Sequence, residues 1–528
     1  MPKVLVSDPV AKEGIEILQK EFEVDVKPGM EKSELINIIG DYDALVVRSE
    51  TKVTADVLEA AKNLKIIGRA GVGVDNIDVP VATQKGIIVV NSPAGNTIAA
   101  AELTMAMMLS LSRNIPQGHE MLRAGEWKQA RKQLVGNELY HKTLGVLGLG
   151  KIGSAVAKRS QSFEMEVIGC DPFVSEEYAQ KLGIELVSFD DLLKRSDYIT
   201  LHVPATKDTK GSIGAKQIAM MKDGVRIINV ARGGIVDEAA LAKAVEEGKV
   251  AGIAFDVYES EPPPADNPLL KLDKAITTPH LGASTEEAQI NVAVDVAEQI
   301  VDVLNGKPAR SAVNMPALSA EVMTAVDPYM LLGERMGAMA TQLVDKPIKS
   351  IEISYCGELS TLETGPVGRA VLKGLLQPIL TESVNLVNAP IIAESRGIRI
   401  IESKSAAPED YTNVLAVKVK MDKGEKTIEG TLFGKKDIRI VTIDGYPIDI
   451  VPEGALLVTT HIDKPGIIGR VGTVLGNNRI NIAGMHVGRE GIGKQAVMVL
   501  NVDNIVPESV MKQITELDGV RTAKLVQF

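Results

Sequence analysis

Cysteine, aromatic residues and long apolar stretches are all scarce in this chain of 528 residues. Cys170 and Cys356 are the only cysteines, too few for a disulfide framework, so we expect a reducing, cytoplasmic location. With 7 Phe, 1 Trp and 9 Tyr, the cores must be built from Val, Ile, Leu, Ala and Met. No apolar run is long enough to span a bilayer, and the N-terminus has no signal-peptide layout, so we expect no membrane partner.

Basic residues are also in deficit, because 58 Lys and Arg face 69 Asp and Glu for a net charge of −11. Such a chain is a poor nucleic-acid binder, since that affinity comes mostly from neutralised phosphates. We expect neither a nucleic-acid partner nor a metal site, and an anionic substrate would need locally placed arginines. The 45% apolar and 24% charged content is typical of a folded protein, and the length suggests three or four domains.

Two α/β series open the chain. Over residues 1–92, short apolar runs alternate with helical patterns, which is typical of a parallel sheet covered on both faces. A second series starts with a long helix at Asn96, and its six candidate strands match a doubly wound dinucleotide fold. These strands are expected at 144–149, 166–170, 198–203, 225–230, 251–257 and 275–278. One more helix is predicted over 284–304, opened by a capping box of Ser284 and Glu287.

The remainder of the chain has a different pattern. A linker is expected at 314–318, and alternating strands with one helix predict a small α+β domain over 319–452. After Pro452 the order of elements is βαββαβ, which is typical of a ferredoxin-like unit.

A glycine-rich loop joins the first strand of the second series to a helix. Gly148 would make the tight turn, Gly150 would let the backbone approach a pyrophosphate, and Gly153 would let helix and strand pack closely. The next strand ends in Asp171, whose carboxylate can accept from an adenosine ribose 2′-OH and would repel a 2′-phosphate, which favours NAD over NADP. The alternative is an ordinary glycine turn with Asp171 capping the turn before Pro172.

Three chemically useful side chains follow late strands, at the edge where open α/β sheets bind ligands. They are Arg232, Glu261 and His280. An imidazole suits the proton transfer that accompanies oxidation of a 2-hydroxy acid, and a neighbouring carboxylate would orient it. A guanidinium can hold the substrate carboxylate through two parallel hydrogen bonds. Singly, each residue is more often a surface or capping group, so the prediction rests on the three together.

Five segments resemble the D-isomer-specific 2-hydroxyacid dehydrogenases, and the likeness extends over essentially the whole chain. They are 69–78, 91–102, 148–153, 229–237 and 278–284. The closest resemblance is to long-form members with two regulatory domains. It implies a discontinuous flavodoxin-like substrate domain (1–98 and 284–314), a Rossmann-type NAD-binding domain (99–283), an intervening α+β domain for anion or substrate effects (319–452) and an ACT domain (455–528).

The same resemblance implies an activity: NAD-dependent oxidation of D-3-phosphoglycerate to 3-phosphohydroxypyruvate, the first step of L-serine biosynthesis, by a homotetramer under L-serine feedback. Cofactor contacts, besides the three glycines, fall on Val72, Lys151, Ile152, Asp171, Val203, Val230, Ala231, Arg232, Asp256 and His280. Val72 lacks the hydroxyl that many relatives carry there. Substrate contacts fall on Arg48, Gly73, Val74 and Asn96, with Arg69 nearby, and serine contacts fall on His461, Asp463 and Asn481.

Two other functions remain open at this point. A glyoxylate- or hydroxypyruvate-type dehydrogenase would share the fold but would not need Arg48 for a phosphate. A non-enzymatic NADH-sensing protein would share the cofactor site. The ACT-like unit, in turn, could serve only to dimerise the chain.

Overall fold

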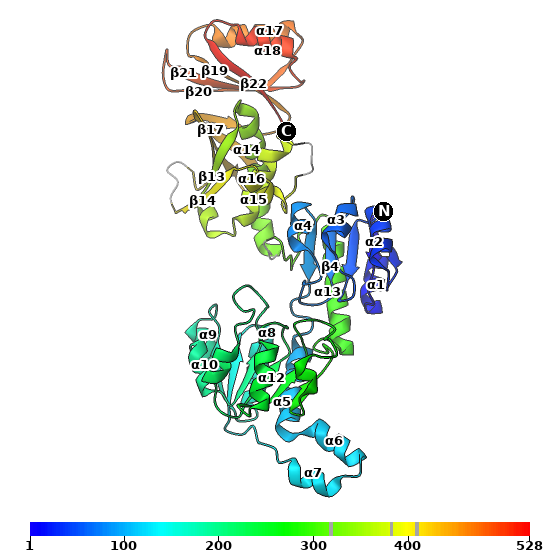
Figure 1. Cartoon of the computed structure of the whole chain (residues 1–528). Coiled ribbons are helices and arrows are strands. Elements are labelled where there is room, and N and C mark those ends of the chain that lie inside the picture. The colour runs from blue at the N-terminus through cyan, green and yellow to red at the C-terminus, as the bar shows by residue number, and fades with distance from the viewer. Residues whose placement is uncertain (316–319, 381–383, 407–410) are drawn as a thin grey trace.

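The computed structural model describes residues 1–315, 320–380, 384–406 and 411–528. Its strands form four sheets, of five, seven, six and four strands in chain order. The first two sheets lie at one end of the molecule, and the last two stack at the other end (Figure 1). Residues 316–318 of the expected linker lie outside the described residues. Among the described helices, none has the length and apolar content needed to cross a membrane.

The first sheet is parallel, as predicted. Its elements are β1 (Lys3–Val6), α1 (Lys12–Gln19), β2 (Glu23–Val26), α2 (Lys32–Ile38), β3 (Ala44–Val47), α3 (Ala55–Ala60), β4 (Ile66–Arg69), α4 (Val79–Gln84) and β5 (Ile88–Asn91), with a 3-10 turn at Ile39–Asp41. The strand order β2-β1-β3-β4-β5 is that of flavodoxin-like folds. Apolar side chains fill both faces, so the strands could be recognised as short continuous apolar runs.

A helix from far along the chain completes this first layer. In α13 (Glu286–Leu304), Val296 and Ile300 lie against Gly68 of β4 and belong to the same hydrophobic core as Val4 and Val6 of β1. A Cβ on Gly14 of α1 would lie 2.7 Å from the carbonyl oxygen of Ala293, so the two helices meet through their backbones. Residues before 100 and after 284 therefore share one hydrophobic core.

The predicted start of α13 is wrong. Its N-cap is Thr285, whose Oγ1 accepts from the backbone N–H of Ala288 at 3.1 Å, and no capping box of Ser284 and Glu287 forms. Ser284 instead donates its backbone N–H to the carbonyl of Leu281 and so belongs to the preceding turn. Two adjacent hydroxyl residues fit the capping pattern equally well, and the preceding turn decides which of them caps the helix.

The second sheet has seven parallel strands, one more than predicted, because the two-residue β8 carries too little pattern to detect. Its elements are α5 (Thr97–Arg113), α6 (Ile115–Arg123), α7 (Trp127–Gln133), β6 (Thr143–Leu147), α8 (Lys151–Gln161), β7 (Glu166–Cys170), α9 (Glu176–Lys181), β8 (Glu185–Leu186), α10 (Phe189–Arg195), β9 (Tyr198–Leu201), α11 (Ala215–Met220), β10 (Val225–Asn229), α12 (Glu238–Glu246), β11 (Val250–Phe255), β12 (Ala275–Thr277) and a 3-10 turn at Pro268–Lys271. The order β12-β11-β10-β9-β6-β7-β8 is doubly wound and reverses between β6 and β9.

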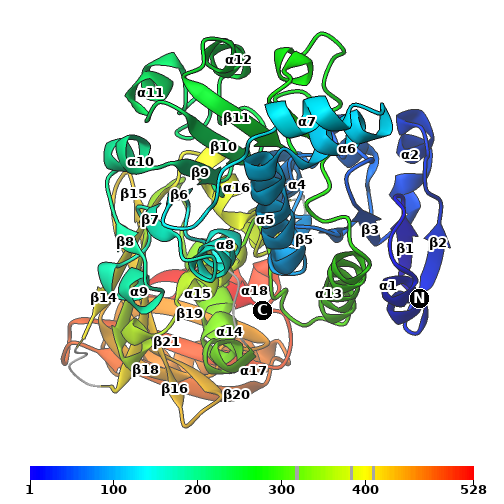
Figure 2. The same ribbon diagram turned by 90° about the horizontal axis from the view of Figure 1, so that it is seen from below.

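Helices cover both faces of this sheet, α5 and α8 on one and α10 to α12 on the other. In Figure 2 the strands β1 to β3 lie on one side of α5 and β9 to β11 on the other. The carboxyl ends of β6 and β9 flank the reversal point, which is where sheets of this type bind ligands.

The third sheet has six strands, with helices on one face. Its elements are α14 (Ala320–Leu343), β13 (Ile348–Gly357), α15 (Gly365–Leu376), α16 (Ala389–Ser395), β14 (Arg399–Ser405), β15 (Asn413–Met421), β16 (Glu425–Phe433), β17 (Asp437–Ile443) and β18 (Tyr446–Ile450), with 3-10 turns at Glu358–Thr361 and Gln377–Ile379. The sequence patterns over 414–421, 426–432 and 438–443 predict strands that match β15 to β17, and the helical spacing over 367–380 overlaps α15. The long helix α14 was missed, although it supplies much of the core through residues such as Leu332 and Met336.

The fourth sheet has the predicted ferredoxin-like order. Its elements are β19 (Ala455–Ile462), α17 (Ile467–Asn477), β20 (Ile482–Arg489), β21 (Gln495–Val502), α18 (Glu508–Thr515) and β22 (Val520–Gln527), and its strands run β20-β21-β19-β22. One face packs under α17 and α18. The other contributes Leu456, Val458 and Val526 to the core of the third sheet, so the two C-terminal units share one apolar core.

Two glycines allow α14 and α15 to pack closely. A Cβ on Gly374 of α15 would lie 1.9 Å from the carbonyl oxygen of Glu334, and one on Gly337 of α14 would lie 2.1 Å from that of Val371. Both obstacles are backbone atoms, so a methyl group there would force the helices apart.

We expect Gly374→Ala to destabilise this part of the chain by about 1–3 kcal/mol through overpacking, seen as a lower Tm in calorimetry. The control is Gly472→Ala in α17, where nothing lies within 4 Å of the added methyl group. There alanine should be neutral or stabilising by up to about 1 kcal/mol, because it is the better helix former. Equal Tm values for the two variants would contradict the close packing.

Candidate active site

A buried carboxylate fixes the turn that carries His280. Asp256 follows β11 and is fully buried, and it accepts hydrogen bonds from Thr278 Oγ1 at 2.6 Å, from Leu281 N at 2.7 Å and from Gly282 N at 2.9 Å. Its carbonyl accepts from His280 N at 2.9 Å. Burial raises the pKa of Asp256, while these hydrogen bonds oppose the rise. The turn is held so firmly that His280 adopts φ of 54°, an uncommon left-handed conformation for this residue type.

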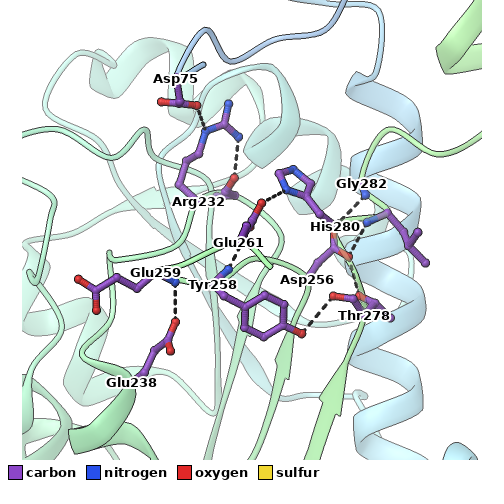
Figure 3. Close-up of polar contacts among 12 residues, drawn as sticks. Asp75, Arg232, Glu238, Asp256, Tyr258, Glu259, Glu261, Thr278, His280 and Gly282 are labelled. Atoms are coloured by element: carbon purple, nitrogen blue, oxygen red, sulfur yellow. Dashed lines mark hydrogen bonds and ion pairs between the residues drawn. The ribbon is translucent and has the colours of Figure 1, made fainter. Parts of the chain in front are cut away.

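The second predicted residue, Glu261, lies beside His280. Glu261 Oε2 is 2.7 Å from His280 Nδ1, and Glu261 Oε1 accepts from Tyr258 N at 3.1 Å (Figure 3). Burial alone would raise the pKa of Glu261, but the hydrogen bond and charge of His280, with Tyr258 N and Arg232, bring the pKa below its usual range. The ionised carboxylate can only accept, so Nδ1 donates and Nε2 is left free to take a proton.

Arg232 reaches the same cleft from the loop after β10. Its Nε is 3.1 Å from Asp75 Oδ2 and its Nη1 donates to the carbonyl of Ala231 at 2.7 Å (Figure 3). Asp75 belongs to the loop after β4, so this ion pair joins the first sheet to the second. A Cβ on Gly73 would come within 2.0 Å of Arg232 Nη2, which means the loop wraps closely round the guanidinium.

The glycine loop has the geometry that a pyrophosphate requires. Gly148 has φ of 91°, and a Cβ on Gly153 would lie 2.0 Å from the carbonyl oxygen of Gly148, whereas the position on Gly150 faces open space. Asp171 accepts from Leu149 N and from Phe173 N, both at 2.8 Å. Asp171 can therefore both cap the turn at Pro172 and bind the cofactor, because each of its carboxylate oxygens keeps a further lone pair for a ribose hydroxyl.

Most of the remaining predicted contacts meet in one cavity of about 270 Å³. Among those that line it are Val72, Gly73, Asn96, Ile152, Val203, Val230, Ala231, Arg232 and His280. The side chain of Val74 packs into the core of the first sheet instead. Lys151 is exposed at the start of α8.

Buried polar atoms without partners gather round this cleft. They include Arg69 Nε, Asn96 Oδ1, Thr97 Oγ1 and His202 Nδ1. Burial lowers the pKa of His202 to about 3, so its ring is neutral. Buried groups of this kind normally have a hydrogen-bond partner, so a polar ligand such as a dinucleotide fits the site.

A second cavity, of about 560 Å³, opens on the other side of His280. Its wall includes Lys52, Arg69, Glu261 and His280, but not Arg48. Burial and the charge of Arg232 lower the pKa of Arg69 to about 10, which leaves it protonated at neutral pH. Sequence reasoning missed Lys52 and Asp75, because neither a lysine in a loop nor an ion pair across 157 residues leaves a local pattern.

The three predicted effector residues do not form one cluster within the chain. His461 is buried on β19, where burial lowers its pKa and Asp463 opposes this. Asp463 is paired with Arg489 at 3.1 Å, and Asn481 donates to Asp503 at 2.8 Å. Asp463 precedes α17 and Asn481 follows it, so about 16 Å of helix separates them.

Three parts of the chain match known families. Residues 105–282 match the D-isomer specific 2-hydroxyacid dehydrogenase, NAD binding domain. Residues 325–444 match the D-3-phosphoglycerate dehydrogenase intervening domain, and residues 454–519 match the ACT domain. The cofactor of this enzyme class is accordingly NAD.

Solved structures resemble about three-fifths of the molecule. A D-lactate dehydrogenase from Aquifex aeolicus, complexed with NAD and lactic acid, is 30% identical with a TM-score of 0.54, covering 60% of this chain and 100% of its own. A glyoxylate reductase from Paecilomyes thermophila is 31% identical with a TM-score of 0.55, covering 59% of this chain and 98% of its own.

Sequence relatives extend the likeness to the whole chain. The D-3-phosphoglycerate dehydrogenases of Archaeoglobus fulgidus and Methanocaldococcus jannaschii are each 50% identical over 100% of both chains. That of Bacillus subtilis is 44% identical over the same extent. The chain therefore belongs to the D-3-phosphoglycerate dehydrogenase family, within the D-isomer specific 2-hydroxyacid dehydrogenases.

Proposed function

We propose that this protein oxidises D-3-phosphoglycerate to 3-phosphohydroxypyruvate with NAD, the first step of L-serine biosynthesis. The observation that carries the proposal is the pair of His280 and Glu261, which line a second cavity that also contains Arg69 and Lys52, while His280 also lines the dinucleotide cavity. We assign residues 1–98 and 284–314 to substrate binding and 99–283 to NAD binding. Their hydrophobic cores support this partition. The two-cysteine composition supports a cytoplasmic location.

The chemistry follows from the free Nε2 of His280. As the C2 hydrogen leaves as hydride, Nε2 takes the proton of the C2 hydroxyl, and the carbonyl forms. Bound NAD supplies the hydride acceptor. Glu261 keeps the ring in the tautomer with Nε2 free and stabilises the imidazolium that results. Arg232 can hold the substrate carboxylate with the guanidinium atoms that Asp75 does not occupy.

Two cations in the second cavity suit the phosphate end of the substrate. Arg69 and Lys52 line the second cavity together with the carboxylates Asp75, Asp78 and Glu261, and the charge of Arg48 also acts on Arg69. Arg69 and Lys52 can each give a phosphate, with its up to two negative charges and several acceptor oxygens, charge-assisted hydrogen bonds. This observation favours the phosphorylated acid over glyoxylate or lactate.

The direct test is NADH formation from D-3-phosphoglycerate, with unphosphorylated D-glycerate as the comparison. We expect a strong preference for the phosphorylated acid. His280→Asn should lower kcat by about 10² to 10⁴ while calorimetry shows NAD binding retained. If the wild-type protein binds NADH but produces no NADH from either acid, the NADH-sensing alternative is favoured. Equal rates of NADH formation from both acids would favour a glyoxylate-type dehydrogenase.

A second prediction concerns pH. Because the pKa of Glu261 is lowered, its carboxylate stays ionised at neutral and mildly acidic pH. Glu261→Gln keeps an acceptor for Nδ1 but removes this ionised carboxylate, so the part of the acidic limb of the kcat/KM profile that follows protonation of Glu261 should be lost. We also expect kcat to fall on the order of a hundredfold. An unmoved acidic limb would contradict the electrostatic role of Glu261.

We further propose a homotetramer. Neither α6 nor α7 buries a residue, and Ile115, Leu122 and Trp127 are exposed on this arm, which projects beyond the second sheet (Figure 1). Exposed apolar side chains on a projecting arm fit contact with a second copy of the chain. The distance between Asp463 and Asn481 supports paired ACT domains, since one serine could touch both residues only if they come from different copies. Light scattering after size-exclusion chromatography tests the stoichiometry, and a monomer would contradict it.

L-Serine is the proposed effector of the paired ACT domains. We expect serine to inhibit turnover and raise the Tm, by preferential binding to one state. Asp463→Asn removes the charge that would meet the serine ammonium group, so half-inhibition should need about tenfold more serine or beyond. Arg489→Gln is the control, since it breaks the Asp463 ion pair but keeps the carboxylate. Serine that changes neither rate nor Tm would defeat the proposal.

A further inference from the structure

A buried carboxylate lies beneath the loop between β3 and α3. Asp8, two residues beyond β1, is 1% exposed and has no cation among its hydrogen-bond donors. Its Oδ2 accepts from Arg48 N at 2.6 Å and from Glu50 N at 3.2 Å. Its Oδ1 accepts from Thr51 N at 3.0 Å and from the Thr51 hydroxyl. The charge of Asp8 is therefore met by the donors of one loop.

The same loop is held from its other side. Asn76 Nδ2 donates to the carbonyls of Arg48 at 3.1 Å and Thr51 at 2.7 Å. The backbone N–H of Val53 donates to the carbonyl of Asn76 at 2.8 Å. Asn76 belongs to the loop after β4 that also carries Asp75, so the loop of residues 48–53 lies clamped between two others.

Residues next to the clamped ones line the cavity beside His280. Ser49, Lys52 and Thr54 all contribute to its wall, whereas Asp8 does not. The charge of Asp8 also acts on Arg69, where it helps to keep the guanidinium protonated. Asp8 thus influences two cations of this wall without facing the cavity.

We propose that Asp8 is a positioning residue for the phosphate end of the substrate: it fixes the loop 48–53 so that Lys52 lines the cavity that His280 also lines. The inference rests on the proposed function. An asparagine in its place could accept at only one of its two side-chain atoms, so part of the loop would lose its anchor. The carboxylate and hydride-transfer ends of the substrate would be unaffected.

Asp8→Asn tests this assignment. The KM for D-3-phosphoglycerate should rise about tenfold or more, the loss expected when buried donors lose their acceptor, while the KM for NAD stays within about twofold. The preference for D-3-phosphoglycerate over D-glycerate should shrink by a similar factor. An unchanged preference in a folded variant would overturn the assignment.

The matched control is Asp43→Asn, in the same sheet. Asp43 accepts from Lys3 N at 2.9 Å and pairs with Lys65, at the edge opposite the cavity. The Asp43→Asn variant should have a lower Tm but unchanged KM values for D-3-phosphoglycerate and NAD. If it changed the substrate preference as much as Asp8→Asn does, the assignment would be overturned.

A second pair of variants covers the case in which Asp8→Asn fails to fold. Thr51→Val keeps the side-chain volume but loses the hydroxyl that donates to Asp8, whereas Thr51→Ser keeps that hydroxyl. The valine variant should show the raised KM and the serine variant should not, and identical KM values would count against the proposal. Wild-type protein inactive on D-3-phosphoglycerate defeats the proposed function itself, which is a separate outcome.

Discussion

The hydrogen bond between His280 Nδ1 and Glu261 is the contact on which the chemistry of this site depends. It assigns the proton to one nitrogen of the ring and leaves the other available. The bond forms only if the two loops that carry Glu261 and His280 keep their relative positions. The buried Asp256 holds the His280 loop by accepting three hydrogen bonds from it. A carboxylate that never meets the substrate thus determines where the base stands.

Buried or half-buried carboxylates recur as loop anchors at the edges of both α/β sheets. Asp256 holds the turn after β12, Asp171 joins the glycine loop to the end of β7, and Asp8 holds the loop after β3. In each case the donors are largely backbone N–H groups, which are strong partners for an ionised oxygen. The catalytic groups themselves remain half-exposed, as a site that admits substrate requires. Rigidity and access are therefore supplied by different residues.

Local patterns were sufficient for much of this architecture. The parallel strands, the glycine loop and the βαββαβ unit each carry their own periodicity, and the spacing after late strands brought Arg232, Glu261 and His280 together at one edge. The helix α14 was missed because the internal Pro328 and the glycines Gly333 and Gly337 are unfavourable in helices and made the segment look interrupted. Asp75 and Asp8 could not be predicted, since their partners are brought near only by the packing of distant segments.

The apolar core shared by the third and fourth sheets has a mechanical consequence. The sheet of β19 to β22 is covered by its own helices on one side and by the preceding unit on the other. Separating the two would expose Leu456, Val458 and Val526 to water, so we expect the two units to stay together as one rigid body. The C-terminal half contacts the first unit where Asn385 donates to the carbonyl of Gly86, just beyond α4. The loop that carries Asp75 and Asn76 ends where α4 begins. A change in the orientation of the C-terminal half would therefore act on the chain only one short helix away from the substrate cleft.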